Sequence, residues 1–129
     1  MKAYLQKLIG TAVLGLALCS HSLPAWAGSA DLSRVEVGTN FGKGTMAGAR
    51  YSGDSQQYIG CSFSETYDLT VNCLARDKTG KSFVCWSNDV RFVDAVKAMT
   101  DYSHISFSSA PGTTSCRDII VTNSSSHLR

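Results

Sequence analysis

The sequence predicts an α+β fold, in which one amphipathic helix packs on a mostly antiparallel β-sheet in the order β-β-β-β-α-β-β. Residues 56–63, 68–76 and 81–86 alternate between apolar and polar side chains, which is the period of a half-buried strand. Residues 89–99 instead repeat at the period of a helix. Four cysteines lie in the same part of the chain, and this even number indicates two disulfides.

Residues 1–27 have the composition of a secretory signal peptide. A positive start precedes an apolar stretch at residues 8–18, which is too short to span a bilayer. Small residues around Ala27 suit a signal peptidase, whereas the bulky Leu18 makes Cys19 a poor site for a lipid anchor. We therefore expect cleavage after Ala27 and a secreted or periplasmic protein without an anchor at Cys19.

The charge of the chain changes when this leader is removed. Ten basic residues then balance ten acidic ones, so the formal net charge is zero. No basic stripe points to nucleic acid, and no second apolar stretch would hold the chain in a membrane. We therefore expect neither nucleic acid nor, after signal removal, a membrane among its partners.

The segment after the leader, residues 28–47, is rich in Gly, Ser and Thr and predicts a flexible start with at most one weak strand. A single α+β domain is expected over residues 48–125, followed by a polar tail at 126–129. Turn residues divide this domain into six strands. The predicted strands are 47–51, 56–63, 68–76, 81–86, 103–108 and 116–122.

The helix over 89–99 interrupts these strands. Ser87 or Asn88 is its expected cap, and Asp89 suits the positive end of the helix. Because one side of its helical wheel is apolar, the helix should lie on the sheet. That side carries Phe92, Val93, Ala95, Val96 and Met99.

The register of the second and third strands suggests how the cysteines pair. If their hairpin turns at residues 65–68, positions whose numbers sum to 134 face each other, and Cys61 and Cys73 are such a pair. Cys85 is then left for Cys116. Cys61–Cys116 with Cys73–Cys85 stays an open alternative, because direct cross-strand disulfides are geometrically demanding. No close C-x-x-C spacing indicates a metal site, and no motif indicates a cofactor.

These residues resemble a group of small secreted bacterial proteins that are largely uncharacterised. The resemblance covers residues 48–125: ARYSGDSQQYIGC, the stretch Cys73–Asp77, and Ser103–Phe107, together with the later cysteines and the Asn-Ser-Ser near the C-terminus. It implies export, disulfides and a shared fold. It implies no catalytic residues.

A hydrolase is the weaker functional interpretation. His104 could act as a general base, but no G-x-S-x-G turn presents a nucleophile, and the carboxylates are scattered. His127 lies in the polar tail and is expected to be solvated. We therefore predict no catalytic residue, and a small secreted hydrolase is kept only as a second alternative.

A binding module is the preferred interpretation. If the helix covers the cysteine side of the sheet, the other side presents aromatic rings among hydroxyl and amide groups, a platform for a sugar ring or a partner's loop. The rings could instead be covered as a second core, which we expect for Tyr58 and Trp86, whereas Tyr102 and His104 are the better binding candidates. We predict recognition of a protein partner or an envelope glycan; the alternative is an inhibitor of a secreted cell-wall hydrolase, acting through loop 62–68 or 108–115. The candidate residues are Tyr102, His104, Ser106, Asn72, Trp86 and Tyr58.

Overall fold

The computed structural model describes residues 32–66 and 68–127, so the predicted leader lies outside the described residues. It confirms the α+β class: two antiparallel sheets, two α-helices and two disulfides. The elements in chain order are β1 (Glu36–Val37), β2 (Phe41–Thr45), α1 (Met46–Arg50), β3 (Tyr58–Ser64), β4 (Thr70–Arg76), β5 (Ser82–Ser87), α2 (Val90–Lys97), β6 (His104–Ser109), β7 (Cys116–Thr122) and the 3₁₀ helix η1 (Ser125–His127).

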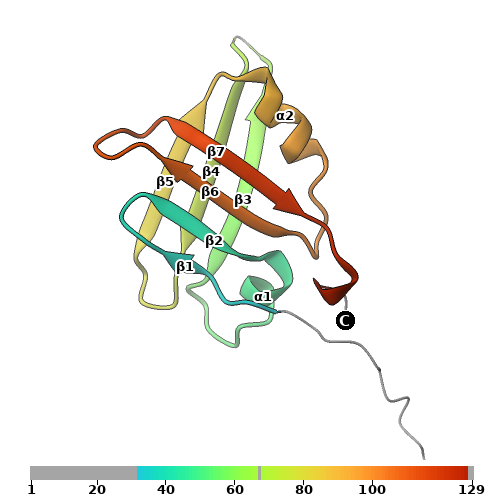
Figure 1. Cartoon of the computed structure of the whole chain (residues 1–129). Coiled ribbons are helices and arrows are strands. Elements are labelled where there is room, and N and C mark those ends of the chain that lie inside the picture. The colour runs from blue at the N-terminus through green and yellow to red at the C-terminus, as the bar shows by residue number, and fades with distance from the viewer. Residues whose placement is uncertain (1–31, 67, 128–129) are drawn as a thin grey trace, which may run out of the picture.

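The strands form two sheets rather than the one expected. One sheet has the order β1-β2-β6-β7 and the other has the order β3-β4-β5. Figure 1 shows the strands of the first sheet running across those of the second, so that the two sheets are stacked face to face. The division arises because β6 pairs with β2, which comes much earlier in the chain, and not with β5. Local alternation in a sequence carries no signal for such a distant pairing.

The core lies between the two sheets. Ile105 and Phe107 of β6 are at most 1% exposed, and the ring of Phe107 stacks on that of Phe83 from the other sheet at 5.7 Å between centroids. Val93 and Val96 of α2 complete the same cluster. The helix thus covers one end of the stack, beside the ends of β3 and β7 (Figure 1).

The expectation that residues 28–47 are flexible is wrong for the described part of that segment. β2 is an inner strand of its sheet, paired with β1 on one side and β6 on the other. Its glycines serve close packing: a Cβ on Gly42 would come within 2.5 Å of the Ala75 Cβ on the opposite sheet. The absence of a side chain at Gly42 therefore lets the two sheets approach.

The strand predicted at 47–51 is also wrong, because these residues belong to α1 and its C-cap. Thr45 is the N-cap of this helix. Its Oγ1 accepts a hydrogen bond from the Gly48 amide at 2.9 Å and donates one to the Ser33 carbonyl at 3.0 Å. A threonine cap followed by two alanines favours a helical turn over a strand.

The second helix, α2, begins at Val90, one residue later than a cap at Asn88 would place it. Asp89 is the N-cap, and its Oδ1 accepts from the Arg91 amide at 2.9 Å, while Ser87 Oγ accepts from the Asp89 amide. The predicted apolar side is confirmed, since Val93 and Val96 are buried. In the part of the chain that the structure describes, no helix is long and apolar enough to cross a membrane.

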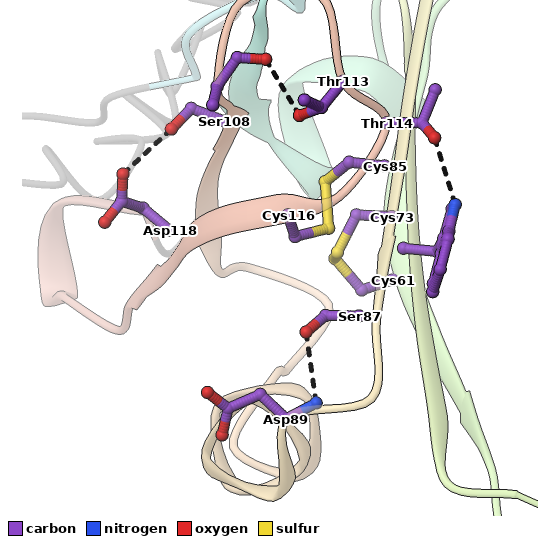
Figure 2. Close-up of a disulfide and its surroundings, with 12 residues drawn as sticks. Cys61, Cys73, Cys85, Ser87, Asp89, Ser108, Thr113, Thr114, Cys116 and Asp118 are labelled. Carbon is purple, nitrogen blue, oxygen red and sulfur yellow. Dashed lines mark hydrogen bonds between the residues drawn. A yellow bond between two sulfur atoms is a disulfide. The ribbon is translucent and has the colours of Figure 1, made fainter.

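The preferred disulfide pairing is confirmed, and the alternative is wrong. Cys61 faces Cys73 across β3 and β4 with a Cα–Cα distance of 4.1 Å. Cys85 is bonded to Cys116, which joins β5 of one sheet to β7 of the other at 5.0 Å between Cα atoms. Figure 2 shows the two disulfides beside each other between the sheets.

Candidate functional site

The six candidate residues lie on two separate surfaces rather than one. Because the sheets stack through their apolar sides, each sheet has its own outer face, and the two outer faces point in opposite directions (Figure 1). One group belongs to the β3-β4-β5 sheet, whereas the other belongs to β6 and the turn before it. The first group is Tyr58, Asn72 and Trp86, and the second is Tyr102, His104 and Ser106.

The outer side of the β3-β4-β5 sheet presents what we call the aromatic face: Tyr58, Asn72, Leu74, Val84 and Trp86. The sheet register brings these residues together. Leu74 lies between Gly60 and Val84, and Asn72 lies between Ser62 and Trp86. The cysteines of these strands occupy the inner side, as the alternation predicts. The result is a continuous strip of apolar surface with polar groups beside it.

Tyr58 lies flat on the sheet. An added Cβ on Gly60, two residues along the same strand, would lie 3.1 Å from the Tyr58 Oη and 3.5 Å from Cζ. The ring therefore occupies the space that a side chain at position 60 would fill. Packing of an aromatic ring over a glycine in this way holds the ring parallel to the strand and leaves its other side towards solvent.

Trp86 is held by hydrogen bonds to the 110–115 loop. Its indole Nε1 donates a hydrogen bond to Thr114 Oγ1 at 3.1 Å, and its backbone amide donates to the Thr114 carbonyl at 2.9 Å. Thr114 belongs to the 110–115 loop that joins β6 and β7, and its side-chain bond is drawn in Figure 2. The loop thus fixes the indole while its ring remains accessible.

The exposures decide between a binding surface and a second core. Tyr58 is 52% exposed, Trp86 is 46% exposed and Val84 is 48% exposed, so the second-core alternative is wrong for these residues. No carboxylate occupies an outward strand position of this sheet among the described residues. Arg76 supplies the one positive charge there, and its Nε donates to Ser82 Oγ at 3.1 Å. The face is therefore apolar at its centre and rich in hydrogen-bond donors at its edge.

Tyr102 lies on a different part of the molecule, in the turn before β6. It separates two shallow depressions and is half-buried between them. One depression, of about 280 Å³, is lined by hydroxyl and amide side chains from Thr100, Asn123, Ser124 and Ser125. The other, of about 310 Å³, lies against α1.

His104 faces outward from β6 as predicted, but the expectation for His127 is wrong. His127 is 5% exposed and its ring stacks on that of His104 at 5.9 Å between centroids. The 3₁₀ turn η1 folds the C-terminal segment back onto the outer side of β6 and brings the two rings together. Ser106, the next outward position of β6, is half-buried.

The carboxylates with shifted pKa values accept hydrogen bonds from neighbouring side chains and, except for Asp118, from backbone amides. Hydrogen bonds from Arg91 lower the pKa of Asp89 to about 2, and those from Gln57 lower that of Asp54 to about 2. Bonds from Thr79 and from Arg117 likewise lower the pKa values of Asp77 and Asp118. A general acid needs a raised pKa instead. Within the described ranges, no three or more His, Cys, Asp or Glu side chains gather as a metal site.

Two features of these surfaces were missed by sequence reasoning. The restraint on Tyr58 had a visible signal, because a glycine stands two residues from a tyrosine on the same side of a predicted strand. The restraint on Trp86 had none, since Thr114 lies 28 residues away. Comparisons of the chain with known protein families, with curated proteins and with solved structures found no match.

Proposed function

We propose that the protein is an exported binding module that holds a glycan of the cell envelope on its aromatic face. The observation that carries this proposal is that two exposed rings, Tyr58 and Trp86, are each held in place by a specific neighbour, Gly60 and Thr114. Rings that are fixed in advance lose little conformational freedom when a ligand binds.

The chemistry of the aromatic face suits a glycan better than a protein. One side of a sugar ring is apolar and stacks on an aromatic ring, while its hydroxyl groups need donors and acceptors around it. Asn72, Ser62 and Arg76 supply these groups next to the rings. A protein partner normally inserts anchor side chains into pockets. None of the depressions described above is lined by residues of the aromatic face.

Export is part of the proposal, and two features support it. The first is the leader-like composition of residues 1–27. The second is the pair of disulfides, which persist mainly in oxidising compartments such as the periplasm and the extracellular space. A protein in either compartment meets envelope glycans directly.

The test is retention of the exported protein, beginning at Gly28, on insoluble chitin, cellulose and purified cell-wall sacculi. Tyr58→Ala and Trp86→Ala should each weaken retention at least about tenfold, which is the loss expected when an anchoring aromatic side chain is removed. Phe41→Ala is the matched control, because Phe41 is a partly exposed aromatic residue (39%) on the other sheet. Equal retention of all three variants, or capture of a protein but no polysaccharide, would contradict the proposal.

The inhibitor alternative rests on the 110–115 loop. Thr113 donates from its amide and its Oγ1 to the Ala110 carbonyl, at 3.1 and 3.0 Å, and Cys116 anchors the end of the loop. The loop projects beyond the sheets in Figure 1. If it blocks a hydrolase, the protein should slow the clearing of a cell-wall suspension by the secreted enzymes of its host, and Pro111→Arg should abolish the effect. Unchanged clearing would remove this alternative.

A further inference from the structure

The depression between α1 and the turn that carries Tyr102 is a second candidate site. It has a volume of about 310 Å³ and lies at the small end of the range for ligand pockets, about 300–1,000 Å³. It shares no residue with the aromatic face. Its lining residues are Met46, Ala47, Arg50, Tyr51, Asp101 and Tyr102.

The α1 wall of this depression is one side of a helix. Met46 and Arg50 are four residues apart, as are Ala47 and Tyr51, and this spacing places each pair on the same side of the helix. The Met46 amide donates to the Ser103 carbonyl at 3.0 Å, which fastens the start of α1 to the start of β6. The two walls are therefore joined by the backbone.

The opposite wall is a turn that is fastened at both ends. The Thr100 amide donates to Ser103 Oγ at 2.8 Å, and the Ser103 amide donates to the Thr100 carbonyl at 3.0 Å. Asn123 ties this turn to β7: its Nδ2 donates to the Ala98 carbonyl at 2.9 Å and its Oδ1 accepts from Ser103 Oγ. Asp101 and Tyr102 thus project from a turn with little freedom to rearrange.

The two charges in the lining have opposite signs and come from opposite walls. Arg50 is on α1 and Asp101 is on the turn, and both are exposed. Among the described residues, neither of them forms an ion pair with another side chain. A guanidinium binds a carboxylate through two parallel hydrogen bonds, and a carboxylate accepts from an ammonium group. The thioether of Met46 and the ring of Tyr102 supply apolar surface beside them.

We propose that this depression binds a small zwitterion with an apolar side chain, either a free amino acid or a short peptide. Arg50 receives the carboxylate, Asp101 receives the ammonium group, and Met46 and Tyr102 contact the side chain. A ligand that lacks either charge loses one of the two polar contacts. This proposal is independent of glycan binding on the aromatic face, since the two sites have no residue in common.

The test is an NMR titration of the exported protein with phenylalanine and with two blocked analogues, N-acetylphenylalanine and phenylalaninamide. Phenylalanine should shift the amide resonances of residues 46–51 and 101–102. It should bind about tenfold more tightly than either analogue, because each analogue lacks one charge-assisted contact. Alanylphenylalanine distinguishes the two ligand classes. If the dipeptide binds more tightly than phenylalanine, the ligand is a short peptide; if phenylalanine binds more tightly, the ligand is a free amino acid.

Two substitutions test which group of the ligand each charged residue binds. Arg50→Gln should bind phenylalanine and phenylalaninamide equally, whereas Asp101→Asn should bind phenylalanine and N-acetylphenylalanine equally. Arg117→Gln and Asp94→Asn are the matched controls, since both positions are exposed and lie outside the depression. The proposal is overturned if the blocked analogues bind as well as phenylalanine, or if neither zwitterion shifts these resonances at about 10 mM, where a millimolar Kd would give near-saturation.

Discussion

The indole of Trp86 and the hydroxyl of Thr114 are joined by a hydrogen bond of 3.1 Å between residues that are 28 positions apart. This bond connects the edge strand β5 of one sheet to the loop between β6 and β7 of the other. The Cys85–Cys116 disulfide connects β5 to the first residue of β7, directly after this loop, and Cys85 is the residue before Trp86. The orientation of an exposed aromatic ring therefore depends on the way the two sheets are joined.

Thr114→Val should free the indole while preserving the shape of the loop. Trp86 is half exposed and water can replace the lost acceptor, so the free energy of unfolding should fall by less than about 1 kcal/mol. Fluorescence anisotropy should fall, and so should glycan retention. Trp86 is the only tryptophan after Gly28, so the signal reports this ring alone. Thr113→Val removes a hydrogen bond within the same loop but none to the indole, and wild-type anisotropy in Thr114→Val would show that the Trp86–Thr114 bond does not hold the ring.

Gly60→Val should displace the ring of Tyr58. The new Cβ would lie 3.1 Å from the Tyr58 Oη, and the two methyl groups that valine adds beyond it require the ring to move further. The scale of β-propensity spans only about 1 kcal/mol and favours valine over glycine, so we expect little loss of stability but a large loss of glycan retention. Ser64→Val, at an exposed position farther along β3, should change neither. Full retention by Gly60→Val would mean that a flat Tyr58 ring is not required.

The β3-β4-β5 sheet could be predicted from the sequence because its signals are local. Consecutive strands pair through short turns, and alternation fixes which side faces inward, so the register that opposes Cys61 and Cys73 follows from the position of one hairpin. The Cys85–Cys116 bond then followed by elimination. Residues 77–80, between the predicted strands 68–76 and 81–86, form a turn in which Asp77 Oδ1 accepts hydrogen bonds from Thr79 and Gly80 has a φ of +85°.

The other sheet could not be predicted in this way, because its strands are defined by distant partners. Gly42 gives β2 a composition typical of a flexible segment, yet its missing side chain is what allows β2 to pack against Ala75. The same reason explains the divided candidate site. His104 and Trp86 both alternate outward from their own strands, but alternation does not say that those strands belong to different sheets. The depression beside α1 escaped prediction because that helix was expected to be a strand.

The two disulfides should differ in their contribution to stability. The Cys61–Cys73 bond closes a loop between residues 12 positions apart. The Cys85–Cys116 bond closes a longer loop, between residues 31 positions apart. Chain entropy alone then gives about 3 kcal/mol for the first and about 4 kcal/mol for the second. Replacing Cys85 and Cys116 by alanine should therefore lower the free energy of unfolding in urea more than replacing Cys61 and Cys73. The reverse order would show that strain or residual structure outweighs loop length.

Acid should loosen the N-terminal part of the fold through Asp54. The Oδ1 of Asp54 accepts from the amides of Gln56 and Gln57, at 2.9 and 2.8 Å, and its Oδ2 accepts from Gln57 Nε2 at 2.6 Å. The Oε1 of Gln57 in turn accepts from the Val35 amide at 2.8 Å. Asp54 therefore orients the side chain that holds the segment leading into β1.

These bonds lower the pKa of Asp54 to about 2 from its ordinary value of 3.8, the side-chain bond from Gln57 being the largest cause. Because the folded-state pKa is the lower one, the stabilisation is complete above the unfolded value of 3.8 and is lost as the pH falls through about 2. Asp54→Asn cannot accept from Gln57 Nε2 at the former Oδ2 position. Its melting temperature should therefore be lower than that of the wild type at neutral pH. The difference should shrink as the pH falls from 3.8 to about 2.

Amide hydrogen exchange provides the second measurement. In Asp54→Asn at neutral pH, the Val35 amide should exchange faster than in the wild type, because its acceptor on Gln57 is no longer held in place. The amide of Ile105, which is fully buried at the centre of its sheet, should keep its protection unless the whole fold opens. If Val35 exchanges equally in both proteins, the connection from Asp54 through Gln57 does not hold the N-terminal segment, and the acid sensitivity has another origin.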